Sequence, residues 1–229
     1  MTLNLPFLER NARYLFLAPA LIYVLAFSIF PLVYSIYLSL TSWQITAEGA
    51  QTTFVALANF ESLLNDSRFL HSLVVTVGIM ASALTVESLL GLFIGILLAE
   101  EIRFKNFYRV VYALPMMMAP IGVAITWRLL LDADIGVVNF LIKRLGGPLV
   151  LWRSDPVMAI VALILVDSWQ WTPFVILVIL AGLQVMPVEP FEAAEVDGAS
   201  RPQRFLHLTL PMISPVMYAV ILLRLSLIH

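Results

Sequence analysis

Two acidic residues deep inside apolar stretches are the first candidates for chemistry in this sequence. Glu87 and Asp167 each lie near the middle of a long uncharged run. A charge at the centre of a membrane-spanning helix costs at least ~2.5–3.5 kcal/mol, so it usually faces a polar interior and often marks a functional site. Gln170 and Trp171 follow Asp167 at i+3 and i+4 and share its helix face. A carboxylate, an amide and an indole together suit a polyhydroxylated ligand, because the ring stacks on C–H faces while the polar groups bind hydroxyls.

A structural role explains the same residues, and both interpretations stay open. Glu87 and Asp167 are also typical of polar contacts that hold membrane helices together. Trp127 and Arg128, near the end of another apolar run, are placed to join the Asp167 face. Trp127, Arg128 and Trp169 equally suit an anchoring belt at the membrane surface.

Catalytic and metal-binding patterns are missing from the sequence. It has no glycine-rich phosphate loop, no Ser-x-x-Lys and no serine elbow. It has no cysteine, which excludes disulfides, cysteine-bound zinc and thiol catalysis, and its three histidines lack metal-ligand spacing. We therefore expect no enzyme activity, no metal site and no cofactor bound by this chain.

The composition requires lipid as the solvent. Of the 229 residues, 61% are hydrophobic and 12% charged, whereas a soluble domain is about half apolar and a quarter charged. The net charge of −2 excludes a basic nucleic-acid footprint. A bilayer core needs about 20 apolar residues per helix. Five runs meet or approach that length and predict an all-α, polytopic transmembrane bundle, namely Tyr14–Leu40, Ser72–Ala99, Tyr108–Leu131, Val157–Leu183 and Met212–Ile228.

Details of these runs predict further features of the bundle. The first is too long for a signal peptide, whose apolar region has about 7–15 residues, and is interpreted as an uncleaved span. Pro115 and Pro120 interrupt the third run and Pro173 the fourth, which predicts bends lined by protein or a water-filled cavity, or else simple packing kinks.

Basic residues in the loops place the N-terminus in the cytoplasm. With that orientation seven Lys and Arg residues lie inside and four outside, which agrees with the positive-inside rule. Two external segments, Phe54–Leu64 and Ile135–Leu145, have helical apolar spacing and are predicted to be short helices, the second ended by Gly146-Gly147-Pro148. Two interpretations stay open for both: a helix over the outer mouth of a pathway, or a loop helix that lies on the surface.

The segment 185–211 is predicted to form a cytoplasmic elbow. Pro187 and Pro190 begin a short acidic helix that carries Phe191 as an exposed aromatic, and Gly198 ends it. Ser200 then caps a second helical stretch, with Pro202 in its first turn. Such a compact knob suits docking into a groove on a partner, although composition alone fits a solvated turn equally well.

The spacing within this elbow resembles the EAA signature of ABC importer permeases. Glu192-Ala193-Ala194 is followed after three residues by Gly198 and after nine more by Leu208-x-Leu210-Pro211, and Leu208 replaces a common Ile. Residues 15–40, 59–69, 113–139 and 167–187 also resemble binding-protein-dependent sugar permeases. The similarity is to the carbohydrate-uptake group with maltose-, trehalose- and glycerol-phosphate-type members, in particular its first (MalF- or SugA-like) permease subunit.

The resemblance implies the type I ABC importer permease fold, with five of six core spans present in a single domain, 1–229, that is expected to be truncated at its C-terminal end. It implies a multi-pass protein of the bacterial cytoplasmic (inner) membrane. The implied partners are membrane lipid, a second homologous permease, two ATP-binding subunits that hold ATP and Mg, an extracytoplasmic solute-binding protein and a carbohydrate such as trehalose or maltose, but no nucleic acid.

The resemblance also assigns roles to residues. The segment around Glu192–Gly198 would be the coupling helix for the ATPase, with Glu192, Ala193, Ala194, Asp197, Gly198, Leu208, Leu210 and Pro211 as its site. The pathway candidates remain Asp167, Gln170, Trp171, Glu87 and Trp127. Three rivals stay open: an ion-coupled secondary transporter that relays protons through Glu87 and Asp167, a membrane-embedded enzyme, and an assembly scaffold.

Overall fold

The computed structural model describes residues 6–46, 49–99 and 103–227, which divide into two compact units, 1–74 and 75–229. Helices dominate both units, as the composition predicts, and four helices are long and apolar enough to cross a membrane, or five if one bent pair is counted as a span. Each unit is described by itself.

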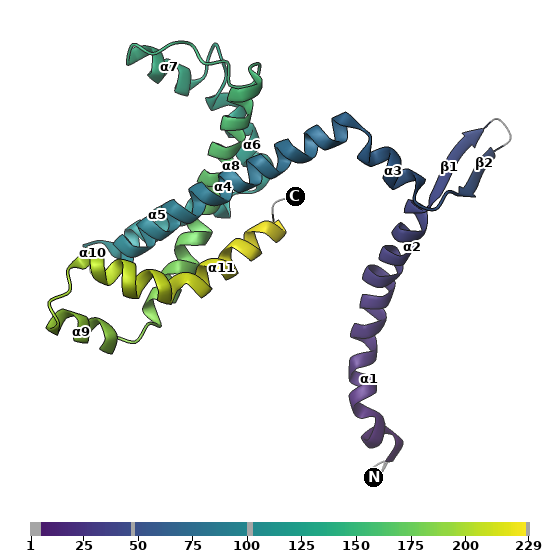
Figure 1. Cartoon of the computed structure of the whole chain (residues 1–229), viewed down its shortest axis with the longest axis horizontal. Coiled ribbons are helices and arrows are strands. Elements are labelled where there is room, and N and C mark those ends of the chain that lie inside the picture. The colour runs from purple at the N-terminus through teal and green to yellow at the C-terminus, as the bar shows by residue number, and fades with distance from the viewer. Residues whose placement is uncertain (1–5, 47–48, 100–102, 228–229) are drawn as a thin grey trace, which may run out of the picture. The chain divides into compact units, whose positions relative to one another are not determined.

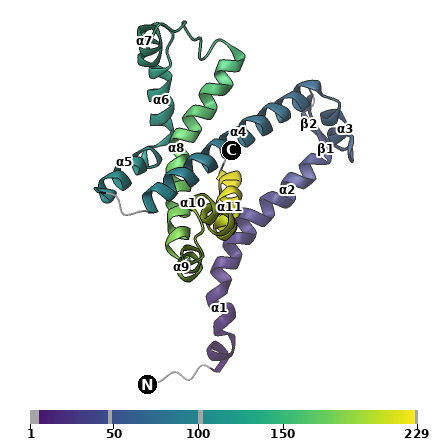
Figure 2. The ribbon, with the colours of Figure 1, turned by 60° about the vertical axis from the view of Figure 1, so that its left-hand side comes forward.

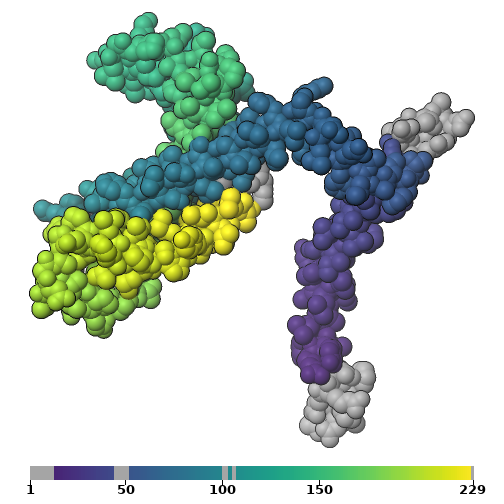
Figure 3. Space-filling model, viewed as in Figure 1, coloured from purple at the N-terminus to yellow at the C-terminus, as the bar shows by residue number. Residues whose placement is uncertain are grey.

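The first unit begins with one long apolar rod (Figure 3). It consists of α1 (Pro6–Val24), the wide π-helical turn η1 (Leu25–Ile29) and α2 (Phe30–Ser39), and Arg13–Ser39 meets the criteria for a span. None of that window is buried within the chain, which suits a helix surrounded by lipid or by other subunits. The predicted first span is therefore present at nearly its predicted bounds.

A β-hairpin after this rod was not predicted. Strands β1 (Thr41–Thr46) and β2 (Gly49–Phe54) pair antiparallel, with Thr41 opposite Phe54. The predicted surface helix Phe54–Leu64 is consequently wrong at its start, because Phe54 ends a strand and α3 covers only Ala58–Leu64. Asn59 ties α3 to the end of the rod and to the start of β1 by donating through Nδ2 to the carbonyls of Ser39 and Thr41, each at 2.9 Å.

Both π-helical turns stand in the same relation to a proline. In η1, the N–H of Phe30 donates to the carbonyl of Leu25, and Pro31 follows. In η2 (Phe205–Thr209), the N–H of Leu210 donates to the carbonyl of Phe205, and Pro211 follows. A proline cannot donate to the i−4 carbonyl and its ring clashes with it. The wide turn opens that space and lets the helix continue past the proline.

The second unit is built around α8 (Pro156–Gln184), which contacts α5 (Lys105–Met117), α6 (Pro120–Leu130) and α11 (Leu210–Leu227) (Figure 1). The long helix α4 (Ser67–Ala99) begins at the end of the first unit and crosses α8 in the second. Two short helices lie at opposite ends of this unit, as two views agree: α7 (Val137–Arg144) at one end and α9 (Glu189–Val196) at the other (Figure 2).

Glycines bring these helices close together. A Cβ on Gly91 would collide with the Val175 side chain, and one on Gly95 would lie 2.9 Å from Cγ2 of Ile179. This Gly-x-x-x-Gly pair lets α4 approach α8 closely, as small residues do at membrane helix interfaces. Around the contact lies a core of buried residues, namely Leu92, Val175, Ile179, Ile213 and Val220.

The predicted third span, Tyr108–Leu131, is broken. Helices α5 and α6 meet at an angle of 95°, because Met118 and Ala119 are extended, with ψ of 139° and 136°. The residue before a proline avoids the helical region, and Pro120 imposes this on Ala119. Pro173, in contrast, lies inside the uninterrupted α8. The interruption predicted at Pro120 is confirmed. Helices α5 and α8 continue through Pro115 and Pro173, so neither proline ends its helix, and the bend predicted at each of them stays a prediction.

The last helix is longer than predicted. The expected span Met212–Ile228 is part of a continuous helix of 27 residues, Arg201–Leu227, which comprises α10 (Arg201–Arg204), η2 and α11. It begins at a capping box, in which the Ser200 N–H donates to Oε1 of Gln203 at 2.8 Å. The second helical stretch of the elbow and the last span are therefore one element.

Candidate functional site

A buried ionic network joins the three main helices of the second unit. Arg224 on α11 donates from Nε and Nη2 to the two carboxylate oxygens of Glu87 on α4, each at 2.7 Å. Arg224 also donates from Nη2 to Oδ2 of Asp167 on α8 at 2.9 Å. Side chains of Glu87 and Arg224 are 0% and 1% exposed, while 34% of the Asp167 side chain is exposed. We call these three residues the charge triad.

The triad combines a strong and a weaker arm. Glu87 and Arg224 form a bidentate fork, the geometry in which guanidinium and carboxylate bind most strongly. The Asp167 arm is a single bond, and Nη1 of Arg224 is buried with no hydrogen-bond partner among the described residues. Removing one partner of a buried ion pair destabilises a protein by about 3–5 kcal/mol, because the other charge is left unpaired. The fork therefore locks α4 to α11, and Asp167 is the member that remains accessible.

The predicted pathway residues separate into three places. Trp171 lies beside the triad, with the Arg224 guanidinium carbon 4.8 Å from its ring centroid, a cation–π contact. Gln170 is buried and donates to the carbonyl of Met118, at the break between α5 and α6, over a long 3.5 Å. Trp127 packs edge-on against Trp169, with ring centroids 5.5 Å apart.

Sequence reasoning missed Arg224. It is a lone cation in the last apolar run, so the rule that singled out Glu87 and Asp167 applies to it as well. Its partners lie 137 and 57 residues away, and no spacing pattern could have paired them. Glu87 is enclosed and Asp167 is partly exposed, and the pathway role of each stays a prediction.

The elbow forms a compact end of the second unit (yellow-green in Figure 3). Gly198 has φ of +75° with open space around it, so its glycine is required by backbone conformation and not by crowding. The Glu195–Arg204 ion pair, at 2.9 Å, spans the bend. Glu192 and Ala193 are exposed, and Ala194, Asp197, Gly198 and Leu208 line a hollow of about 400 Å³.

Two expectations about the elbow change. Phe191, predicted as an exposed aromatic, is half-buried, and the exposed apolar side chain on this helix is Val196, at 89%. Leu210 packs against the core of the bundle and Pro211 is exposed on α11, so both belong to the last helix and not to a separate loop.

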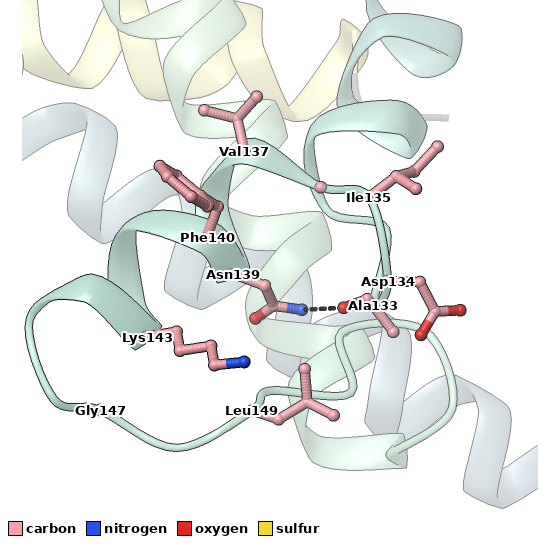
Figure 4. A pocket seen from close by; sticks show the side chains of 10 residues that line it. Ala133, Asp134, Ile135, Val137, Asn139, Phe140, Lys143, Gly147 and Leu149 are labelled. Carbon is pink, nitrogen blue, oxygen red and sulfur yellow. Dashed lines mark hydrogen bonds between the residues drawn. The ribbon is translucent and has the colours of Figure 1, made fainter.

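At the opposite end, Asn139 organises the segment 132–153 around α7 (Figure 4). Its Nδ2 donates to the carbonyls of Val150 (2.9 Å), Asp132 (3.4 Å) and Ala133 (3.4 Å), and its Oδ1 accepts from Val150 N–H and Trp152 Nε1, both at 3.3 Å. The predicted helix Ile135–Leu145 is present as Val137–Arg144, and Gly146, with φ of +81°, ends it as predicted. A hollow of about 670 Å³ adjoins α7.

Asp132 is the electrostatic anchor of this segment. The backbone N–H groups of Asp134 and Ile135 and the positive charges of Arg153 and Arg128 hold the pKa of Asp132 below its ordinary value of 3.8. Arg153 donates from Nη2 to Oδ2 of Asp132 at 2.8 Å. Across the described residues, no three acidic or histidine side chains gather as metal ligands would.

Residues 89–228 match the family described as binding-protein-dependent transport system inner membrane component, and the chain belongs to that family.

Individual relatives place the chain further within this family. It is 40% identical over 185 residues to a probable ABC transporter permease of Sinorhizobium fredii, covering 81% of this chain and 60% of that one. It is 34% identical over 224 residues to the trehalose/maltose transport system permease MalF of Thermococcus litoralis, covering 98% of this chain and 75% of that one. A solved bacterial ABC transporter that imports the acidic polysaccharide alginate has the same fold, with a TM-score of 0.82 at 21% identity over 97% of this chain and 75% of that one.

Proposed function

We propose that this chain is one permease subunit of an ATP-driven importer of carbohydrates, forming half of the pathway beside a second homologous permease. The carbohydrate is a di- or oligosaccharide of the trehalose or maltose type, as in the Thermococcus litoralis relative. Two ATP-binding subunits hold ATP and Mg, and an extracytoplasmic solute-binding protein delivers the sugar. The chain has no catalytic role of its own.

The observation that carries this proposal is the elbow. Glu192-Ala193-Ala194 lies on α9 with Glu192 and Ala193 exposed, Gly198 turns the chain through a positive φ, and the helix that follows runs directly into the bundle. A short helix fixed in this way transmits a push from a partner as a rigid-body motion. In the proposed orientation, with the N-terminus in the cytoplasm, α9 faces the ATP-binding subunits.

Asp167 and Trp171 support the pathway assignment. They lie on one face of α8, where an indole and a partly exposed carboxylate stand side by side. The ring suits the C–H face of a sugar and the carboxylate suits its hydroxyls. Gln170 and Trp127 remain proposed pathway residues, although they contact other parts of the bundle.

The coupling role is tested by Gly198→Asp in the full transporter, with Gly146→Asp as the matched control. Both glycines have positive φ with open surroundings, so both substitutions strain the backbone alike, but only Gly198 lies in the elbow. We expect Gly198→Asp to lose co-purification with the ATP-binding subunits and ATP-coupled uptake while solute-protein binding persists, and Gly146→Asp to keep subunit binding. Unchanged uptake by Gly198→Asp at normal expression would refute the coupling role.

The secondary-transporter alternative is separated by its energy source. A proton relay through Glu87 and Asp167 would need no ATPase. Uptake into proteoliposomes that follows a pH gradient without ATP would support it, whereas uptake that requires internal ATP and the binding protein would exclude it.

A further inference from the structure

The charge triad contains two carboxylates and one guanidinium, so its formal net charge is −1. We propose that this negative charge makes the pathway selective for uncharged saccharides over those that bear a carboxylate or phosphate. We further propose that Glu87 contributes to that selectivity from a position where it cannot touch a substrate. Both statements rest on the proposed importer function.

The three groups differ in burial, so only one of them can contact a solute although all three contribute charge. Glu87 and Arg224 are enclosed at 0% and 1% exposure, so a solute meets neither of them directly. Asp167 is the accessible member, and its Oδ2 is engaged with Arg224. The exposed part of its carboxylate can accept a hydrogen bond from a sugar hydroxyl.

The cation of the triad is out of a solute's reach. Arg224 gives two hydrogen bonds to Glu87, one to Asp167, and lies over the Trp171 ring at 4.8 Å. An anionic solute beside Asp167 and Trp171 therefore finds a carboxylate and an aromatic face, while the positive charge of the triad stays enclosed. An uncharged saccharide meets no such repulsion and gains both contacts.

The fold does not impose this preference. The alginate importer has the same fold and carries an acidic polysaccharide. The sign of the charge at the centre of the bundle is therefore a local property of the side chains. In this chain Glu87 makes the net charge of the triad negative, since without it the charges of Arg224 and Asp167 would cancel.

Coulomb's law sets the size of the effect. One unit charge about 7 Å from a substrate carboxylate, through an effective dielectric constant of about 20–80, changes affinity by about 3- to 60-fold. Glu87→Gln and Asp167→Asn each bring the net charge to zero. Glu87→Met with Arg224→Met keeps it at −1 and replaces the buried pair by apolar side chains, a change that is often tolerated.

The test is direct binding to the purified complete transporter in nanodiscs without its binding protein. The probes are trehalose and maltose, each compared with a derivative in which one primary alcohol is oxidised to a carboxylate. Binding of each probe is measured by the change in tryptophan fluorescence of the transporter. We expect the wild type to favour the uncharged sugar, both zero-charge variants to reduce that preference about 3- to 60-fold, and the Met/Met variant to retain it.

Different results overturn different statements. Equal wild-type affinity for the two forms, or a preference altered by Asp167→Asn but not by Glu87→Gln, would refute the charge mechanism. If Glu87→Gln fails to assemble, the Met/Met variant with and without Asp167→Asn compares −1 with zero through the charge of Asp167, and equal preferences there would refute selectivity by charge. A preference in the Met/Met variant much larger than in the wild type would refute the contribution of Glu87, because both have a net charge of −1. If no saccharide binds and none stimulates ATP hydrolysis with the binding protein present, the importer function itself fails.

Discussion

The glycine contact between α4 and α8 gives a prediction whose size can be worked out from the structure. In Gly91→Ala the new methyl group collides with the Val175 side chain, whose Cβ lies 2.9 Å from the place the added carbon would occupy. Gly78→Ala, on the same helix, places its methyl group where no described atom beyond its chain neighbours and the adjacent backbone of its own helix lies within 4 Å. The two variants therefore make the same chemical change in crowded and in open surroundings.

The magnitude follows from two opposing effects. Replacing glycine by alanine inside a helix stabilises it by about 0.5–1 kcal/mol. Overpacking a tight contact costs about 1–3 kcal/mol. Gly78→Ala should gain only the helix stabilisation. Gly91→Ala should gain the same helix stabilisation and lose the overpacking cost, so the unfolding free energies of the two variants should differ by that cost, about 1–3 kcal/mol.

Reversible unfolding of the purified chain in mixed detergent micelles measures that difference, because the helix term cancels between the variants. Adding Val175→Ala to Gly91→Ala removes the colliding methyl groups and should restore part of the loss. Equal stability of Gly91→Ala and Gly78→Ala would show that α4 and α8 do not approach each other as described.

Three further predictions concern charged and polar groups. Arg224→Met should destabilise the bundle by about 3–5 kcal/mol in the same assay by leaving Glu87 unpaired, whereas Glu87→Met with Arg224→Met should stay near the wild type; equal losses in both would contradict this. Asn139→Leu should speed hydrogen exchange across residues 132–153 and leave the helices of the bundle unchanged, and unaltered exchange there would refute its organising role. Because the pKa of Asp132 is depressed in the folded chain, its stabilising contribution is complete above its ordinary value of 3.8 and is lost as the pH falls through the folded value. Protection from exchange in the same segment, relative to the intrinsic exchange rate at each pH, should thus be high at about pH 5 and fall below 3.8, and Asp132→Asn should abolish that fall.

Apolar runs and helix-breaking glycine and proline residues predicted most helices of the second unit. Helix α8 and the positive-φ turn at Gly198 lie close to where composition and glycine placement put them. Both depend on local physics, the first on hydropathy and the second on a backbone conformation that side chains resist. The helical fold could be predicted from the sequence for this reason.

Features that depend on distant partners were not accessible. Pro120 and Pro173 look alike in sequence, yet one follows a 95° break and the other lies within a continuous helix. The short hairpin strands, β1 and β2, carry too few residues to stand out beside long apolar helices. The charge triad needed three helices to be assembled before Arg224 could meet its carboxylates.

The unbroken helix Arg201–Leu227 has a mechanical consequence. Arg224 lies 23 residues beyond Arg201, about 35 Å along the axis at 1.5 Å per residue. The helix that starts just after the Gly198 turn thus ends in the charge triad, and no loop between them can absorb a displacement. If this helix moves as one rigid body, a displacement of its elbow end either strains the Glu87–Arg224 fork or carries α4 with it, so under the proposed coupling role the buried charges would respond to the elbow.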